Sequence, residues 1–300
     1  MPDTALGFLG LGVMGGPMAR NLVKAGYPVT AYDPDPGRLK AFTDAGGNAA
    51  ASAAAIARAG EIVFLSLPTG DVVRQVVMAD GGLASTMPSG SLIADLSTTE
   101  AKLAQDAAAT CATRGITFMD TPVSGGEQGA IDATLSIMVG GAAAGFARVA
   151  PILACMGRSV VHMGGSGLGQ ATKLINNMIV AAGFAAVCEA WALGAKVGLD
   201  PAMLHEAIKG GWAGSRVMEE TVPRLLARNF VPGGTVDIAV RDVAYGLNMA
   251  RGLDVPVPVA SLAHELFRMA KSQGQGPKAQ PILITLWEQW LGITVGGGKS

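Results

Sequence analysis

The chain has 300 residues, half of them hydrophobic and 15% charged, with a formal net charge of -1. This balance gives no basic surface, so nothing in it supports binding to nucleic acid or to an anionic membrane. The length suggests two domains with ample chain to bury a core.

The three cysteines and three histidines lie too far apart for a disulfide framework or a metal site, which suits a reducing cytoplasm. The most apolar run, Met178 to Cys188, is shorter than the roughly 18 residues that span a bilayer. We therefore expect a soluble cytoplasmic protein in which this run forms a buried helix.

The N-terminal residues follow the order strand, glycine turn, helix, strand and acid. A strand over 5–9 and a helix over 17–25 flank a turn, and a second strand over 28–32 ends at Asp33. In a dinucleotide-binding unit the three glycines serve a tight turn, close approach to the pyrophosphate and helix packing. The turn is predicted to bind the cofactor through Gly10, Leu11, Gly12, Val13, Met14 and Gly15.

Asp33 predicts which dinucleotide binds. A carboxylate at the end of the second strand accepts hydrogen bonds from the ribose 2′-OH and repels a 2′-phosphate. Its neighbour Pro34 cannot hold that phosphate, although Arg38 is close enough in sequence to compensate. We therefore expect NAD in preference to NADP. Asp33 could also begin a turn with Pro34, which does not exclude the cofactor role.

Further strands alternate with helices in the first half, which predicts a mostly parallel, doubly wound α/β sheet of the Rossmann type. The predicted strands cover residues 61–67, 91–95, 116–120, 135–139 and 159–163. Ligands bind such sheets at the carboxyl ends of the strands. That rule brings Leu67, Pro68, Thr98 and Ser124 to the edge that holds the glycine turn.

The loop that contains Ser124, Gly125 and Gly126 is a candidate anion site. A hydroxyl followed by successive backbone N–H groups can cradle a carboxylate. Alternatively, Ser124 caps the following helix. Its place at the cofactor edge favours the cradle.

Four glycines between Gly164 and Gly169 predict a loop, and the apolar pattern predicts a long helix from Leu174 to Val197. Lys173 and Asn177 are four residues apart and so share a helix face. A lysine in the first turn opposes the helix dipole. It either lies along apolar surface with its ammonium group in water, or it has a functional role.

The second half carries helical signals only, over 201–209, 215–226, 236–251, 258–273 and 280–291. Arg241-Asp242 is a charge pair in an apolar helix, either solvated or reaching a cleft. The segment 287–290 is interpreted as core or subunit interface. We predict a dinucleotide-binding domain (1–164), a glycine loop with bridging helix (165–197), an all-α domain (198–295) and a disordered tail (296–300).

These motifs together resemble the β-hydroxyacid dehydrogenase family, which includes 3-hydroxyisobutyrate dehydrogenase and tartronate semialdehyde reductase. The resemblance rests on the glycine turn, on Asp95-Leu-Ser-Thr98, on Asp120-Thr-Pro-Val-Ser-Gly-Gly126 and on Lys173-Leu-Ile-Asn-Asn177. It covers nearly the whole chain. One departure is Arg241, where the family usually has lysine.

The resemblance implies that Lys173 is the catalytic residue. Lys173 suits the role of general acid and base if desolvation and the helix N-terminus lower its pKa toward neutral. It implies that Ser124, Gly125 and Gly126 hold the substrate carboxylate and that Asn177 holds its hydroxyl or the lysine. Thr98 would touch the nicotinamide ribose, and Arg241 would lie near the cofactor. It also implies a homo-oligomer, dimer or tetramer, that needs no metal.

The expected substrate is a small β-hydroxy acid or its semialdehyde. Alternatives within the family are another short semialdehyde, a sulfonated aldehyde, or a sugar acid that is oxidised and decarboxylated. A non-catalytic nucleotide-binding protein is the alternative of a different class, because a fold does not by itself fix a function.

Overall fold

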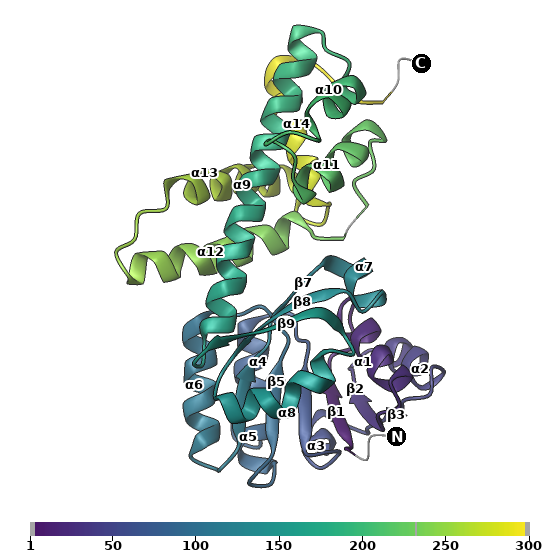
Figure 1. The fold of residues 1–300 in the computed structure, drawn as a ribbon, viewed down its shortest axis with the longest axis vertical. Helices are drawn as coiled ribbons and strands as arrows, with labels where there is room; N and C mark the ends of the chain where they lie inside the picture. Colours follow the sequence, from purple (N-terminus) through teal and green to yellow (C-terminus); the bar gives the residue numbers. More distant parts are fainter. Residues whose placement is uncertain (1–3, 232, 298–300) are drawn as a thin grey trace. The chain divides into compact units, whose positions relative to one another are not determined.

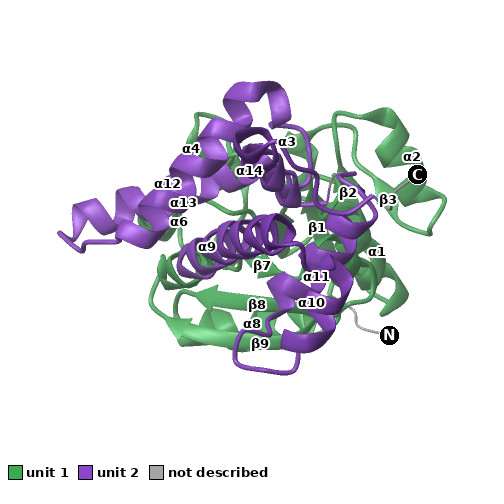
Figure 2. Cartoon of the chain, turned by 90° about the horizontal axis from the view of Figure 1, so that it is seen from above, with its two compact units in different colours: residues 1–173 green, residues 174–300 purple. Residues whose placement is uncertain are grey.

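The computed structural model describes residues 4–231 and 233–297. The chain divides into two compact units, residues 1–173 and 174–300 (Figure 2), and each has hydrophobic core of its own. The three-part division predicted from the sequence stays a prediction. Residues 298–300 of the expected tail lie outside the described residues.

Within the described part of the first unit, nine strands form one sheet in the order β3-β2-β1-β4-β5-β6-β8-β7, with β9 paired to β8 (Figure 1). The strands are β1 (Leu6–Leu9), β2 (Val29–Tyr32), β3 (Asn48–Ala49), β4 (Ile62–Leu65), β5 (Leu92–Asp95), β6 (Thr117–Asp120), β7 (Val123–Ser124), β8 (Leu135–Gly140) and β9 (Gly157–Gly164). The ladders from β3 to β6 are parallel, whereas β8 is antiparallel to β6 and β7. The predicted mostly parallel sheet is confirmed.

Helices cover both faces of this sheet because both faces are apolar. Phe64 packs in a core shared with α1 (Gly15–Lys24) and α8 (Ala143–Leu153), while its neighbour Leu65 packs in a core shared with α4 (Gly70–Met78) and α6 (Ala101–Ala112). Successive residues of a strand point to opposite faces, so a continuous apolar run buries both. The helices are α1 (Gly15–Lys24), α2 (Pro36–Thr43), α3 (Ala53–Ile56), α4 (Gly70–Met78), α5 (Leu83–Thr86), α6 (Ala101–Ala112), α7 (Gly126–Ile131) and α8 (Ala143–Leu153).

The second unit is helical in its described part, as predicted. Its elements after the long helix α9 (Leu168–Val197) are α10 (Pro201–Ile208), α11 (Arg216–Leu226), α12 (Val236–Gly252), α13 (Pro258–Ala270), a π-helical turn (Lys271–Gln275), a 3-10 turn (Gln280–Leu283) and α14 (Ile284–Leu291). Helices α12 and α13 lie side by side as a hairpin (Figure 1). Trp287 belongs to the core, whereas Trp290 is exposed, so the expectation of a core residue holds for Trp287.

The long helix α9 (Leu168–Val197) begins six residues before the predicted start at Leu174. The N–H groups of Gly167, directly before the helix, and of Gln170, in its first turn, donate to the Asp120 carboxylate at 2.8 Å each, which satisfies donors that a helix start leaves open. Lys173 therefore lies in the second turn. The predicted place of Lys173 in the first turn is therefore wrong, and because the dipole effect is strongest in the first turn, a lowered pKa of Lys173 stays a prediction that depends mainly on desolvation.

Helix α9 also bears on the expectation that the apolar run is too short to span a bilayer. Its most apolar 18-residue window has a mean hydropathy of 1.7, and 33% of that window is buried. The whole helix α9, unlike the shorter run Met178 to Cys188, is therefore long and apolar enough to cross a membrane by length and composition alone. Core helices of soluble proteins satisfy the same criterion.

Candidate active site

The glycine turn between β1 and α1 has the backbone geometry that a dinucleotide requires. Gly10 has a φ of 93°, and a side chain there would clash with the carbonyl of Ser66. A side chain at Gly15 would clash with the carbonyl of Gly10. A Cβ built on Gly12 would lie 3.9 Å from Arg38 Nη1, its nearest described neighbour outside the adjacent residues. Gly12 therefore leaves room for a ligand, while Gly10 and Gly15 serve the fold of the turn.

Asp33 is buried at the end of β2 and is bonded to the glycine turn. Its Oδ2 accepts from Leu11 N at 2.7 Å, and its Oδ1 accepts from Asp35 N at 2.9 Å. Asp33 therefore also begins a turn, as the alternative proposed. Arg38 Nη1 lies 3.7 Å from Oδ1, and about half of the Arg38 side chain is exposed. A carboxylate and a guanidinium group thus stand together beside the turn.

The loops after β4 and β5 are joined by side-chain hydrogen bonds. Leu67 N donates to Ser97 Oγ at 2.8 Å, and Ser97 N donates to Asp95 Oδ1 at 3.0 Å. Thr98 is half-buried and Pro68 is exposed. These bonds place Leu67 and Thr98 at the same edge of the sheet, as the parallel order predicts.

Two buried aspartates lie next to each other at that edge, because Asp95 and Asp120 are register partners on β5 and β6. Burial raises the pKa of Asp95 to about 7, against the opposing hydrogen bonds of Ser97, and the charge of Asp120 adds to the rise. Burial also raises the pKa of Asp120, and hydrogen bonds from backbone N–H groups at the start of α9 oppose this rise. Among the described residues Asp95 Oδ2 has no hydrogen-bond partner.

Ser124 ends β7 and is followed by two glycines with positive φ, 137° at Gly125 and 66° at Gly126. Helix α7 has Gly125 at its N-cap and, in the described structure, no capping side chain. The alternative that Ser124 caps this helix is therefore wrong. Its hydroxyl and the following N–H groups keep the composition of an anion cradle.

Lys173 is 9% exposed on α9. This small exposed fraction argues against the alternative in which the ammonium group extends into water. The side chain is withdrawn from solvent and has electrostatic or hydrogen-bonded partners. Burial of a charged amine is costly unless the amine is paired or neutral.

In the second unit a buried aspartate holds two predicted site residues. Asn177 Nδ2 donates to Asp242 Oδ2 at 2.9 Å, and Arg241 Nη2 lies 2.7 Å from Asp242 Oδ1. Asp242 is buried and Arg241 is partly buried. The alternative of a solvated surface pair is therefore wrong. No role for Asp242 is predicted from the sequence, although the position of this carboxylate inside an apolar helix is a signal for one.

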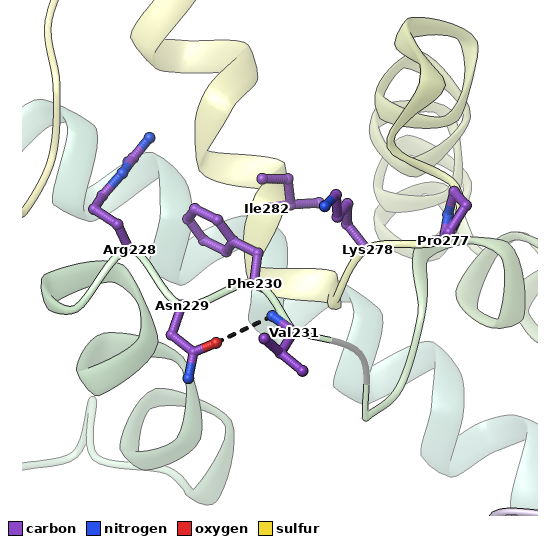
Figure 3. A pocket seen from close by; sticks show the side chains of 7 residues that line it. All are labelled: Arg228, Asn229, Phe230, Val231, Pro277, Lys278 and Ile282. Carbon is purple, nitrogen blue, oxygen red and sulfur yellow. Dashed lines mark hydrogen bonds between the residues drawn. The ribbon is translucent and has the colours of Figure 1, made fainter.

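A pocket of about 690 Å³ also lies in the second unit (Figure 3) and contains none of the predicted site residues. Its arginine, Arg228, is bonded to Glu288, with Nη2 3.0 Å from Oε2, and lies over the Phe230 ring. We assign this pocket no catalytic role. Its lining is Arg228, Asn229, Phe230, Val231, Pro277, Lys278 and Ile282.

Known proteins are similar to this chain along its length. Residues 5–165 match the family described as the NAD binding domain of 6-phosphogluconate dehydrogenase. Residues 167–287 match the family described as NAD-binding of NADP-dependent 3-hydroxyisobutyrate dehydrogenase. These two matches follow one another and account for both units.

Individual relatives are similar over most of both chains. A 2-(hydroxymethyl)glutarate dehydrogenase of Eubacterium barkeri is 34% identical, covering 98% of each chain. A 3-hydroxyisobutyrate dehydrogenase of Pseudomonas aeruginosa is 39% identical, covering 89% of this chain and 92% of its own. The crystal structure of 3-hydroxyisobutyrate dehydrogenase from Salmonella typhimurium superimposes with a TM-score of 0.87 at 29% identity, covering 95% of this chain and all of the other.

Proposed function

The chain belongs to the β-hydroxyacid dehydrogenase family and is an NAD(P)-dependent oxidoreductase, and from this premise we propose that Lys173 is its general acid and base. The reaction moves a hydride between a nicotinamide cofactor and the carbon that bears the hydroxyl of a small β-hydroxy acid. The observation that carries the proposal is the burial of Lys173 on α9, one turn before Asn177.

When bound, the nicotinamide cofactor accepts the hydride as the alcohol becomes a carbonyl. Lys173 Nζ takes the hydroxyl proton at the same time, so the alcohol loses a hydride and a proton together. In reverse, Nζ returns the proton to the developing alkoxide. A positioned acid–base group accelerates such a step by about 10²–10⁴-fold. The lysine must be neutral to act as a base, and removal from water favours that form.

We propose that Ser124, Gly125 and Gly126 hold the substrate carboxylate. A fixed carboxylate decides which hydrogen of the substrate faces the nicotinamide ring, which is an orientation effect. Asn177 is proposed to orient the hydroxyl or Lys173. Its amide is itself held by Asp242, so it is preorganised for that task.

For the cofactor we propose the turn residues Gly10, Leu11, Gly12, Val13, Met14 and Gly15, together with Asp33, Leu67, Pro68, Thr98 and Arg241. The buried Asp33 carboxylate supports NAD as the preferred cofactor, because it would repel a 2′-phosphate. Arg38, 3.7 Å away, is the group that would reduce this preference.

The proposed substrate carries one or two acidic groups. One relative's name specifies 2-(hydroxymethyl)glutarate, a dicarboxylate, and another's specifies 3-hydroxyisobutyrate, a monocarboxylate. The planar guanidinium fork of Arg241 favours a partner that offers two acceptor oxygens, such as a second carboxylate or a sulfonate. We also propose a homo-oligomer in the cytoplasm, on the family resemblance.

The test is steady-state turnover of Lys173→Met with NAD and NADP. It uses 3-hydroxyisobutyrate, 2-(hydroxymethyl)glutarate, 3-hydroxypropionate, serine, glycerate and threonate, with sulfonated analogues and the matching semialdehydes. We expect kcat to fall by about 10²–10⁴-fold, the contribution of a positioned acid–base group.

The matched control is Lys196→Met, an exposed lysine on the same helix, which should keep wild-type turnover. If Lys173→Met stays within a few-fold of wild type, the assignment of Lys173 is wrong. If the wild-type enzyme turns over faster with NADPH than with NADH, the interpretation of Asp33 is wrong.

A further inference from the structure

Gln170 is a completely buried residue of α9 that the proposed mechanism leaves without a role. Its side-chain amide makes two hydrogen bonds to one short backbone segment. Oε1 accepts from Thr99 N at 3.0 Å, and Nε2 donates to Ser97 O at 2.7 Å. The amide thereby bonds the backbone on both sides of Thr98.

These two hydrogen bonds to the backbone fix the conformation of Thr98. The Ser97 carbonyl precedes Thr98 and the Thr99 N–H follows it. Because both groups are hydrogen-bonded to Gln170, the φ and ψ angles of Thr98 are restricted. The segment is held further along by Leu67 N, which donates to Ser97 Oγ. Thr98 is half-buried at the carboxyl edge of the sheet, where the cofactor is expected.

The backbone of Gln170, in the first turn of α9, is bonded at the same time to the end of β6. Its N–H donates to Asp120 Oδ2, and Gly167 N donates to the other oxygen, both at 2.8 Å. Lys173 follows three residues later, and residues i and i+3 are neighbours on a helix surface. One residue therefore connects the Thr98 segment, the end of β6 and the turn of α9 that carries Lys173.

We propose that Gln170 is a positioning residue that sets the distance and orientation between the Thr98 segment and Lys173. The inference rests on the proposed role of Lys173. Gln170 itself touches neither reactant. It acts by holding the cofactor side and the proton-transferring side of the reaction in one rigid unit, since a misplacement of about 1 Å can cost about 10²-fold in rate.

Only a side chain with both a donor and an acceptor at this length satisfies the two bonds. Methionine has nearly the same length and forms neither. An ionised glutamate can accept from Thr99 N but cannot donate to Ser97 O, whereas a protonated glutamic acid has one donor and one acceptor. Gln170→Glu should therefore regain the native bonds as the pH falls, and burial raises the pH at which it does so.

The experiment measures single-turnover hydride transfer by stopped flow, using the acid that wild type oxidises fastest, with and without deuterium on the hydroxyl carbon. Gln170→Met is expected to slow hydride transfer about 10²-fold, with the full deuterium isotope effect expressed. Gln170→Glu is expected to be similarly slow at pH 8.5. Its rate relative to wild type should rise at least tenfold by pH 6, about the ratio expected over this range if the glutamic acid form is the active one.

Gln75→Met is the matched control, because Gln75 is an exposed glutamine on α4, and it should keep the wild-type rate. Circular dichroism identifies the folded protein at each pH. If Gln170→Met does not fold, the pH-dependent rate of Gln170→Glu decides alone, because a role confined to stability would leave the rate per folded molecule unchanged.

A Gln170→Glu rate within threefold of wild type at pH 8.5, or a ratio that does not change with pH, overturns the inference. Lys173→Met in the same assay separates the two proposals. A wild-type rate in Lys173→Met overturns the proposed function. An inactive Lys173→Met beside Gln170 variants of wild-type rate overturns the inference on Gln170 alone.

Discussion

At the scale of single residues, the Asp95 carboxyl group makes the stability of the protein depend on pH. The pKa of Asp95 is raised from 3.8 to about 7 in the folded chain because the group is fully buried. Between those two values the folded state binds more protons than the unfolded state. The free energy of unfolding therefore falls as the pH rises through this window, and the contribution is largest at acidic pH.

Asp95→Asn should remove this dependence, because its amide has no charge to bury and its oxygen can still accept from Ser97 N. We expect the stability of wild type relative to Asp95→Asn to fall from pH 5 to pH 8, with a slope of up to about 1 kcal/mol per pH unit. Urea unfolding followed by circular dichroism at each pH measures it.

Asp80→Asn, a substitution of an exposed aspartate, should leave the wild-type pH dependence unchanged. Parallel stability curves for wild type and Asp95→Asn between pH 5 and pH 8 would show that Asp95 does not retain its proton on folding.

At the scale of elements, the start of α9 depends on a glycine that serves packing. A Cβ built on Gly169 would lie 2.5 Å from the Met138 carbonyl oxygen and 2.7 Å from that of Asp120. Gly183, further along the same helix, has only ordinary contact with the Val217 side chain, at 3.4 Å. The same glycine-to-alanine substitution can therefore be compared at a crowded position, Gly169, and at an uncrowded one, Gly183.

Gly169→Ala should destabilise the protein by about 2 kcal/mol. The gain in helix propensity is at most about 1 kcal/mol, whereas crowding against fixed backbone costs about 1–3 kcal/mol or more. Gly183→Ala should be neutral or stabilising by up to about 1 kcal/mol. Thermal and urea unfolding of both variants measure the difference. Equal effects at the two positions would mean that propensity, and not close packing, governs this helix.

Helix α9 also shows which features of the elements could be predicted from the sequence and which could not. The strand and glycine-turn signals around Gly10 are local, and the predicted strands and helices were found close to their expected bounds. The start of α9 was missed because its anchor, Asp120, is 47 residues from Gly167. Glycines beside the start were interpreted as loop residues, although Gly169 is inside the helix.

The candidate site divides in the same way. Lys173 and Ser124 were predicted from motifs, because each motif is continuous in sequence. The residues that hold the site have no such motif: Gln170 is 71 residues from Thr99, and Asp242, which accepts a hydrogen bond from Asn177, is 65 residues from it. Contacts of this separation depend on how the sheet and helices pack, and periodicity along the chain carries no information on them.

At the scale of the whole molecule, the predicted cofactor residues and the helical core belong to different units. Apart from Arg241, the predicted cofactor residues lie before residue 174. The core of the second unit is separate and includes Phe267, which is completely buried. Stability of the helical core and affinity for the cofactor should therefore vary independently.

Phe267→Ala tests this independence. Truncating a buried phenylalanine to alanine costs about 3–5 kcal/mol in transfer and cavity free energy, so we expect a clear loss of stability. The dissociation constant for NADH, measured by fluorescence titration on the folded variant, should stay within about twofold of wild type, because no predicted ligand in the first unit is altered. NADH at 100 times its dissociation constant should then stabilise either protein by about 2.7 kcal/mol.

Gly10→Ala is the complementary variant, because a side chain there meets the Ser66 carbonyl and the native φ is positive. Its affinity for NADH should fall at least tenfold, the change that a loss of about 1.4 kcal/mol of binding free energy produces. A larger loss of NADH affinity in Phe267→Ala than in Gly10→Ala would contradict the assignment of cofactor binding to the first unit. Unchanged affinity in Phe267→Ala with a lowered melting temperature would support it, since the packing defect would then act on folding without reaching the residues of the first unit that are predicted to bind NADH.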